Sequence, residues 1–88
     1  MSNRHRISPS DLIPYDRRLA MLEEFGRRFG DPQMLLAGFN QAYCEAAALL
    51  PPELEDWQRA EQVARWFEYK LGLRPVEEVD PLILEALS

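Results

Sequence analysis

Residues that build covalent or metal-bound sites are scarce in this sequence of 88 residues, which contains one cysteine, Cys44, and one histidine, His5. A single cysteine excludes a disulfide within the chain, and the two residues together are too few for a zinc site of the usual Cys/His type. His5 precedes every expected helix. The helices therefore cannot carry a catalytic Cys-His or Ser-His pair, and they also lack the histidine ligands of a bundle di-metal site. We therefore predict no catalytic residues, no metal site and no cofactor.

Glycine is also sparse, and the four glycines lie far apart, at positions 26, 30, 38 and 72. This spacing excludes a glycine-rich phosphate-binding loop. No apolar run approaches the length of about 20 residues that spans a bilayer, and residues 1–6 lack the hydrophobic stretch of a secretion signal. We expect a protein of the cytoplasm that does not enter a membrane.

Lysine is represented by Lys70 alone, and the formal net charge is −5. Residues 1–30 hold six arginines against four acidic residues, whereas residues 31–88 hold four basic residues against eleven acidic ones. Binding to nucleic acid is unlikely with this balance, because a phosphate backbone requires a coherent basic surface. The acidic residues gather at expected helix starts and form no continuous stripe, so an inhibitor that mimics nucleic acid stays a minor alternative.

Apolar residues recur at the 3.6-residue period of an α-helix, and no strand pattern or hairpin signal appears. We predict an all-α fold, a small three-helix bundle with a short C-terminal fourth helix. Residues 1–14 are expected to form a loose N-terminal arm and residues 15–88 a single helical domain. The expected helices cover residues 15–29, residues 32 to about 50, residues 53 to about 71, and one or two turns after Asp80-Pro81.

Helix boundaries are marked by proline, aspartate and glycine. Asp31-Pro32 and Asp80-Pro81 each combine an N-cap residue with proline at the first helical position. Gly30 and Gly72 are natural C-terminal stops, and Pro51-Pro52 ends the second helix. The short connections predict that consecutive helices are antiparallel neighbours.

Each helix has a face that its apolar spacing predicts to be buried. In the first helix this face is formed by Tyr15, Leu19, Leu22, Phe25, Gly26 and Phe29. In the second helix, Gly38, Ala42 and Ala46 form a smooth strip that a neighbouring backbone could approach closely. Trp57, Ala60, Val63, Ala64, Phe67 and Leu71 form the expected core face of the third helix.

The third helix carries more large apolar residues than one buried face can hold. Trp66, Tyr69 and Leu73 cluster on the side opposite its core face, where polar residues are usual. One interpretation is that the C-terminal segment folds over these residues and makes a second small core. The other is a binding surface, because exposed aromatic patches tend to mark interaction sites and tryptophan and tyrosine are enriched at binding hot spots.

We interpret the chain as a non-enzymatic protein-protein interaction module, such as an adaptor, a small chaperone, an assembly factor or an inhibitor. The expected partner-binding residues are Trp66, Tyr69, Leu73, Val79, Ile83 and Leu87, the last three belonging to a tail that either covers or extends the surface. A homodimer that uses the same face is the nearest alternative. An enzyme is a formal alternative only, with Cys44 as its nucleophile, although the alanine-rich surroundings of Cys44 favour a structural thiol.

Overall fold

A computed structural model describes residues 8–88 and shows an all-α fold. Its α-helices are α1 (Tyr15–Phe29), α2 (Gln33–Ala46), α3 (Asp56–Lys70) and α4 (Pro81–Leu87). Three short 3-10 helices lie between or before them: η1 (Pro9–Leu12), η2 (Ala47–Leu49) and η3 (Val76–Glu78). The predicted fold class is confirmed.

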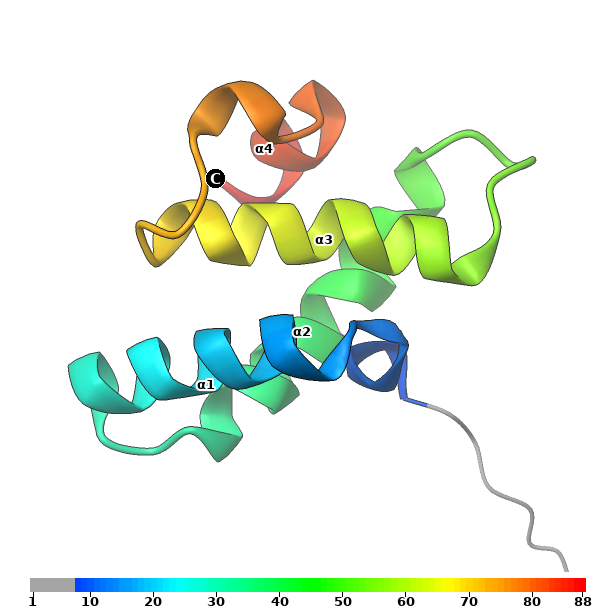
Figure 1. Cartoon of the computed structure of the whole chain (residues 1–88). Coiled ribbons are helices and arrows are strands. Elements are labelled where there is room, and N and C mark those ends of the chain that lie inside the picture. Colours follow the sequence, from blue (N-terminus) through cyan, green and yellow to red (C-terminus); the bar gives the residue numbers. More distant parts are fainter. Residues whose placement is uncertain (1–7) are drawn as a thin grey trace, which may run out of the picture.

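The three long helices pack in a small bundle with α4 on its outer side (Figure 1). Helices α1 and α3 lie side by side and run in the same direction, and α2 returns obliquely behind them. Helix α4 and the loop that precedes it lie on the side of α3 that faces away from α1. As a result, α3 is enclosed by α1, α2 and α4.

The helix boundaries follow the signals in the sequence. Gly30 and Gly72 have φ values of 88° and 77°, a left-handed conformation that glycine adopts without steric cost. The Asp31 side chain accepts a hydrogen bond from the Gln33 N–H at 3.1 Å, and the Asp80 side chain accepts one from the Leu82 N–H at 2.9 Å. Asp80-Pro81 therefore acts as predicted, whereas α2 begins one residue later than predicted, at Gln33, with Pro32 at the N-cap position.

The core lies where α2, α3 and α4 meet. Ala46, Ala60, Val63, Ala64 and Ile83 have no exposed surface. Small side chains let the helix backbones approach, and the larger residues fill the space around them. The buried cluster also includes Ile13, Met21, Leu35, Phe39, Ala42, Leu50 and Leu71.

The folded part of the chain begins earlier than the boundary predicted at residue 15. Residues 1–7 of the predicted arm lie outside the described residues, but the 3-10 helix η1 packs against α2 and α3. The Ser10 N–H donates to Asn40 Oδ1 at 3.0 Å, and both Ser10 and Ile13 are buried. Ile13 is the apolar anchor that fixes this segment.

Helix α1 is rotated relative to the face that its sequence predicts. Tyr15, Leu19 and Phe29 are exposed, and Met21 is the fully buried residue of the helix. The rotation follows from Arg17, which turns toward α3 and pairs there with carboxylates. Part of the apolar face of α1 therefore stays on the surface.

Two further predictions about faces are wrong in detail. Among the described residues, no atom of a neighbouring element lies within 4 Å of the position that a Cβ at Gly38 would occupy, so the smooth strip of α2 is in contact only at Ala42 and Ala46. Trp57 was expected in the core but is 57% exposed, because it lies in the first turn of α3, beyond the edge of α2. None of the helices within residues 8–88 is both long enough and apolar enough to cross a membrane.

Candidate functional site

An apolar groove lies between the C-terminal ends of α1 and α3. It has a volume of about 230 Å³ and is lined by Phe25, Phe29, Trp66, Phe67, Lys70 and Leu71. Helix α1 contributes the two phenylalanines from its last turns, and α3 contributes Trp66, Phe67 and Lys70, with Leu71 following as its C-cap residue. The groove exists because the last turn of α1 lies over the exposed side of α3, so that Phe29 does not enter the core.

Aromatic rings form the walls of this groove. The rings of Phe25 and Phe29 lie 4.7 Å apart, and those of Trp66 and Phe67 meet edge to face at 4.9 Å. Phe29 is 63% exposed, so much of its ring faces solvent. Burying such rings in a complex yields free energy without any change in the fold.

Trp66, the central residue of the predicted surface, is partly buried and fixed in place. Its Nε1–H donates to Ser88 Oγ at 3.2 Å, and its ring packs against the core cluster. The Lys70 amino group lies 5.7 Å from the centre of the Trp66 ring and 5.8 Å from that of Tyr69, within the range of a cation-π contact. The indole is thus held ready at the groove with one face turned to a cation.

The remaining predicted contact residues divide between core and surface. Val79 and Ile83 are buried, and Leu87 packs against the core cluster. The C-terminal segment therefore joins the main core beside Val63 and Ala64, and it reaches the predicted face of α3 at Trp66, through Ser88. Leu73 is 46% exposed and does not line the groove, so the structure brings Trp66 together with α1 and leaves Leu73 apart.

Basic side chains lie in the groove and at its edge, where Arg28 donates a hydrogen bond to the Leu71 carbonyl oxygen at 3.0 Å. Lys70 lines it and forms no ion pair within residues 8–88. Arg27 and Arg28 lie in the last turn of α1, where both pair with Glu24. These four residues sum to a net charge of +2, in a protein whose total formal charge is −5.

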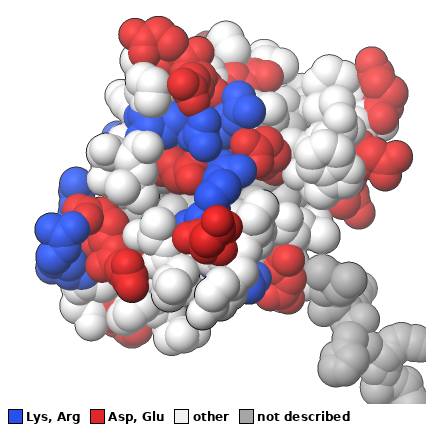
Figure 2. Space-filling model, viewed as in Figure 1, with Lys and Arg blue, Asp and Glu red and all other residues white. Residues whose placement is uncertain are grey.

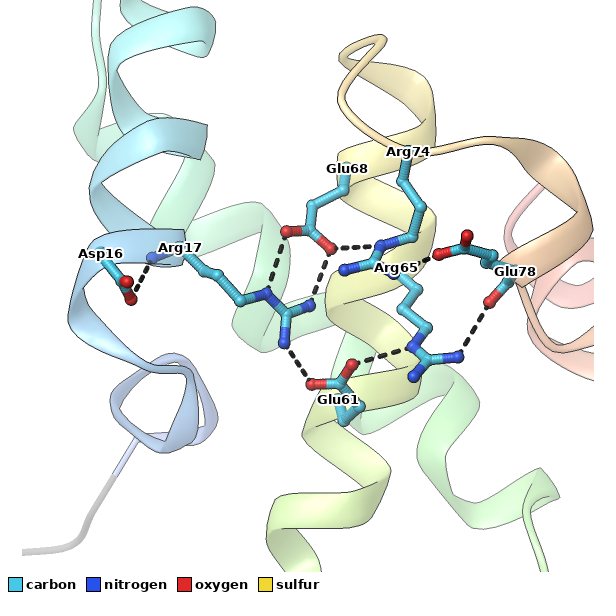
Figure 3. Close-up of polar contacts among 7 residues, drawn as sticks. All are labelled: Asp16, Arg17, Glu61, Arg65, Glu68, Arg74 and Glu78. Atoms are coloured by element: carbon cyan, nitrogen blue, oxygen red, sulfur yellow. Dashed lines mark hydrogen bonds and ion pairs between the residues drawn. The ribbon is translucent and has the colours of Figure 1, made fainter.

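A second polar feature joins α1 to α3 and to the loop before α4 (Figure 3). Arg17 donates two hydrogen bonds to Glu68, at 3.1 and 2.7 Å, and one to Glu61 at 2.5 Å. Arg74 donates to the same Glu68 carboxylate at 2.8 Å, and Arg65 donates to Glu61 at 2.8 Å. Each carboxylate of α3 in this cluster is held by two arginines.

The pairing shifts the pKa values of the cluster in the directions that favour charge. The hydrogen bond to Glu68 is the largest influence on Arg17, and it raises the pKa of that guanidinium. Burial pushes the pKa of Glu61 upward, but its hydrogen bonds to Arg17 and Arg65 outweigh burial and lower the pKa below 4.5. Because the charges satisfy one another, we assign the cluster a structural role.

A shallow, open depression of about 670 Å³ lies at the other end of the molecule, beside the turn between α2 and α3. Its lining includes Tyr43, the exposed Cys44 and Arg59, whose guanidinium donates to the carbonyl oxygens of Ala47 and Pro51. Burial raises the pKa of the Tyr43 hydroxyl above its ordinary value, which makes the phenolate harder to form. The depression contains no activated pair of reactive groups, and within residues 8–88 no three His, Cys, Asp or Glu side chains are placed to hold a metal ion.

The sequence named Trp66 and missed the other five residues of the groove. Phe25, Phe29, Phe67 and Leu71 were expected on the core faces of their helices, and Lys70 carried no signal beyond being the one lysine. The clue that could have identified them is the coincidence of two helix ends rich in aromatic and basic residues, one in residues 25–29 and the other in residues 66–70. No protein-family model, curated protein or solved structure with which we compared the chain matches it.

Proposed function

We propose that this protein is a non-enzymatic interaction module whose groove, defined by Phe25, Phe29, Trp66, Phe67, Lys70 and Leu71, binds a protein partner. The partner segment that fits has an aromatic or large aliphatic side chain flanked by acidic residues. The observation that carries this proposal is an open apolar groove next to a lysine that lacks a carboxylate partner within residues 8–88.

The size of the groove supports a single anchor side chain. A dry apolar cavity of about 150 Å³ is large enough to hold benzene, and this groove measures about 230 Å³. One indole, phenyl or leucine side chain can therefore enter it. Anchor residues in such pockets supply most of the binding free energy in protein interfaces.

The charge around the groove selects the flanking residues. Lys70 and the arginines of the last turn of α1 would attract carboxylates and repel basic segments, since complementary charge speeds encounter and suppresses wrong partners. Lys70 is also exposed, so a salt bridge to a partner carboxylate would replace its contact with the aromatic rings at little cost. An acidic flank thus gives specificity, and the anchor gives affinity.

The alternatives have less support. An inhibitor that mimics nucleic acid requires a continuous acidic surface, but Figure 2 shows basic groups interleaved with the acidic ones on the face where α1 and α3 meet. An enzyme would need an activating group beside Cys44, and the depression there is lined by apolar residues, Tyr43 and an arginine held by carbonyl groups. A cytoplasmic location stays part of the proposal.

Affinity capture from the native host, followed by mass spectrometry, tests this function. The wild-type chain is compared with Phe29→Glu, which places a carboxylate in the groove, and with Leu82→Glu, which places one on an exposed apolar residue of α4 outside the groove. We expect Phe29→Glu to lose the partner by on the order of tenfold or more, as for loss of an anchor, and Leu82→Glu to retain it. Equal capture by all three chains would refute the groove as the binding site.

A further inference from the structure

The chain itself carries a segment of the kind that the groove is proposed to bind. Trp57 is exposed in the first turn of α3, and Glu53, Glu55 and Asp56 immediately before it are exposed as well. This acid-flanked tryptophan matches the groove in both anchor and charge. We propose that copies of this protein associate head to tail, with Trp57 of one copy in the groove of the next.

The position of the two surfaces decides the geometry of the contact. Trp57 is the second residue of α3, and the groove is formed by the last turns of the same helix. A helix of 15 residues is about 22 Å long, so a single copy cannot fill its own groove. The contact joins the Trp57 surface of one copy to the groove of another. Each pair still has one free groove and one free Trp57, so the contact continues as an open chain of copies unless a ring closes.

Charge at the two ends of the molecule is complementary. Figure 2 shows acidic side chains at the end where the turn between α2 and α3 lies; at the opposite end, where α1 ends, it shows a group of Lys and Arg side chains with acidic side chains beside it. Head-to-tail contact brings these ends together, whereas a symmetric contact of two grooves would place like charges opposite each other. The same observation disfavours the symmetric homodimer.

Two other segments of the chain are less suited to occupy the groove of a second copy. The C-terminal segment is already committed, because Ile83 is fully buried and Trp66 is bonded to Ser88. The exposed side of α2 offers small side chains around Gly38, and its exposed charge is the single carboxylate of Glu45. Trp57 combines the largest side chain among the exposed apolar residues with three exposed acidic residues just before it.

This inference rests on the proposed binding role of the groove, and a mixing experiment tests it. Sedimentation velocity is measured up to about 1 mM, because a contact with one anchor is expected to be weak. The wild type should form assemblies larger than a dimer as its concentration rises. These assemblies should become smaller at higher salt concentration, because salt screens the charges. Trp57→Ala and Phe29→Glu should each stay monomeric alone.

A mixture of the two variants gives the decisive result. The groove of Trp57→Ala is intact and Trp57 of Phe29→Glu is intact, so an equimolar mixture should form a heterodimer that grows no further. Lys70→Glu replaces Phe29→Glu if the latter unfolds, and far-ultraviolet circular dichroism checks the fold of each variant. Three results would each overturn the inference. The first is a wild type that is monomeric at every concentration, and the second is association of either variant alone. The third is a mixture that stays monomeric while the wild type associates.

Failure of this inference can be told apart from failure of the proposed function. A monomeric wild type that still captures a host partner, through a groove that Phe29→Glu destroys, refutes self-association alone. A host partner that Phe29→Glu retains refutes the proposed function.

Discussion

Arg17 of α1 donates two hydrogen bonds to the two carboxylate oxygens of Glu68 on α3, and Glu68 is only 6% exposed. A buried carboxylate is costly unless it is paired, so this contact sets the rotation of α1 on the bundle. The rotation in turn leaves Phe29 in solvent and opens the groove. The ion pair and the proposed binding site are therefore parts of one arrangement.

Loss of Arg17 should destabilise the fold. Arg17→Met removes three hydrogen bonds from two carboxylates, and we expect the free energy of unfolding to fall by about 2 kcal/mol, less than for a fully orphaned charge because Arg74 still holds Glu68. Arg27→Met is the control, since Arg27 pairs only on the surface of α1 and its side chain is 74% exposed. Its effect should stay below about 0.5 kcal/mol. Urea unfolding of both variants measures the difference, and equal effects would contradict the structural role of the cluster.

Stability should fall in acid through Glu61. The pKa of Glu61 is lower in the folded state than the ordinary value of 4.5, so its contribution to stability is present above about pH 4.5 and is lost as the pH falls through the lower, folded value. Glu61→Gln removes this titration and should flatten the decline of the urea midpoint below pH 4.5. A variant whose acid sensitivity equals that of the wild type would show that the Glu61 carboxylate is not stabilised by its arginines.

The C-terminal helix should be an integral part of the core. Ile83 has no exposed surface, and Ile83→Ala leaves a cavity that is expected to cost about 2 to 4 kcal/mol. The neighbouring Leu82 is 47% exposed, so Leu82→Ala should cost less than about 1 kcal/mol. Thermal unfolding compares the two, and a stable Ile83→Ala variant would mean that α4 is a displaceable tail.

The same substitution should have opposite effects at two glycines. Gly30 has a φ of 88°, so Gly30→Ala strains the end of α1 and should destabilise the protein by about 1 kcal/mol. Gly38 lies in the interior of α2 with open space around its Cβ position, and Gly38→Ala should stabilise the protein by about 0.5 to 1 kcal/mol. Denaturant midpoints measure both, and a shift of the same sign at both positions would contradict the two backbone assignments.

The sequence predicted the helices well because their ends depend on local chemistry. The Asp-Pro pairs and the glycines at 30 and 72 fix the boundaries through their own backbone geometry, whatever the rest of the chain does. Two boundaries moved by three residues or more: α3 begins at Asp56 instead of residue 53, and α2 changes to 3-10 geometry after Ala46. Pro51 forces Leu50 into an extended conformation and the helix tightens before it.

The side that each helix turns to the core was harder to predict, because it depends on partners far away in the sequence. The apolar spacing of α1 predicted that Leu19 faces the core. The helix is instead rotated by the pairing of Arg17 with Glu61 and Glu68, which lie 44 and 51 positions further along the chain. Trp66 was singled out from the spacing of α3 and lines the groove, whereas the ring that completes this groove, Phe29, comes from another helix. A site made by two helix ends cannot be found from the periodicity of either helix alone.

The Trp66 indole signal in the nuclear magnetic resonance spectrum tests the central claim most directly. The ¹⁵N-labelled protein, kept dilute, is titrated with a short peptide in which one tryptophan is flanked by glutamates, and the spectrum of Trp57→Phe assigns the two indole signals. We predict that the Trp66 Nε1–H signal shifts in a saturable way while the Trp57 signal does not, and that the effect is lost in Phe29→Glu and with a peptide whose glutamates are replaced by lysines. A Trp66 signal that stays unchanged, or that responds equally to the basic peptide, would contradict a groove that recognises acid-flanked apolar segments.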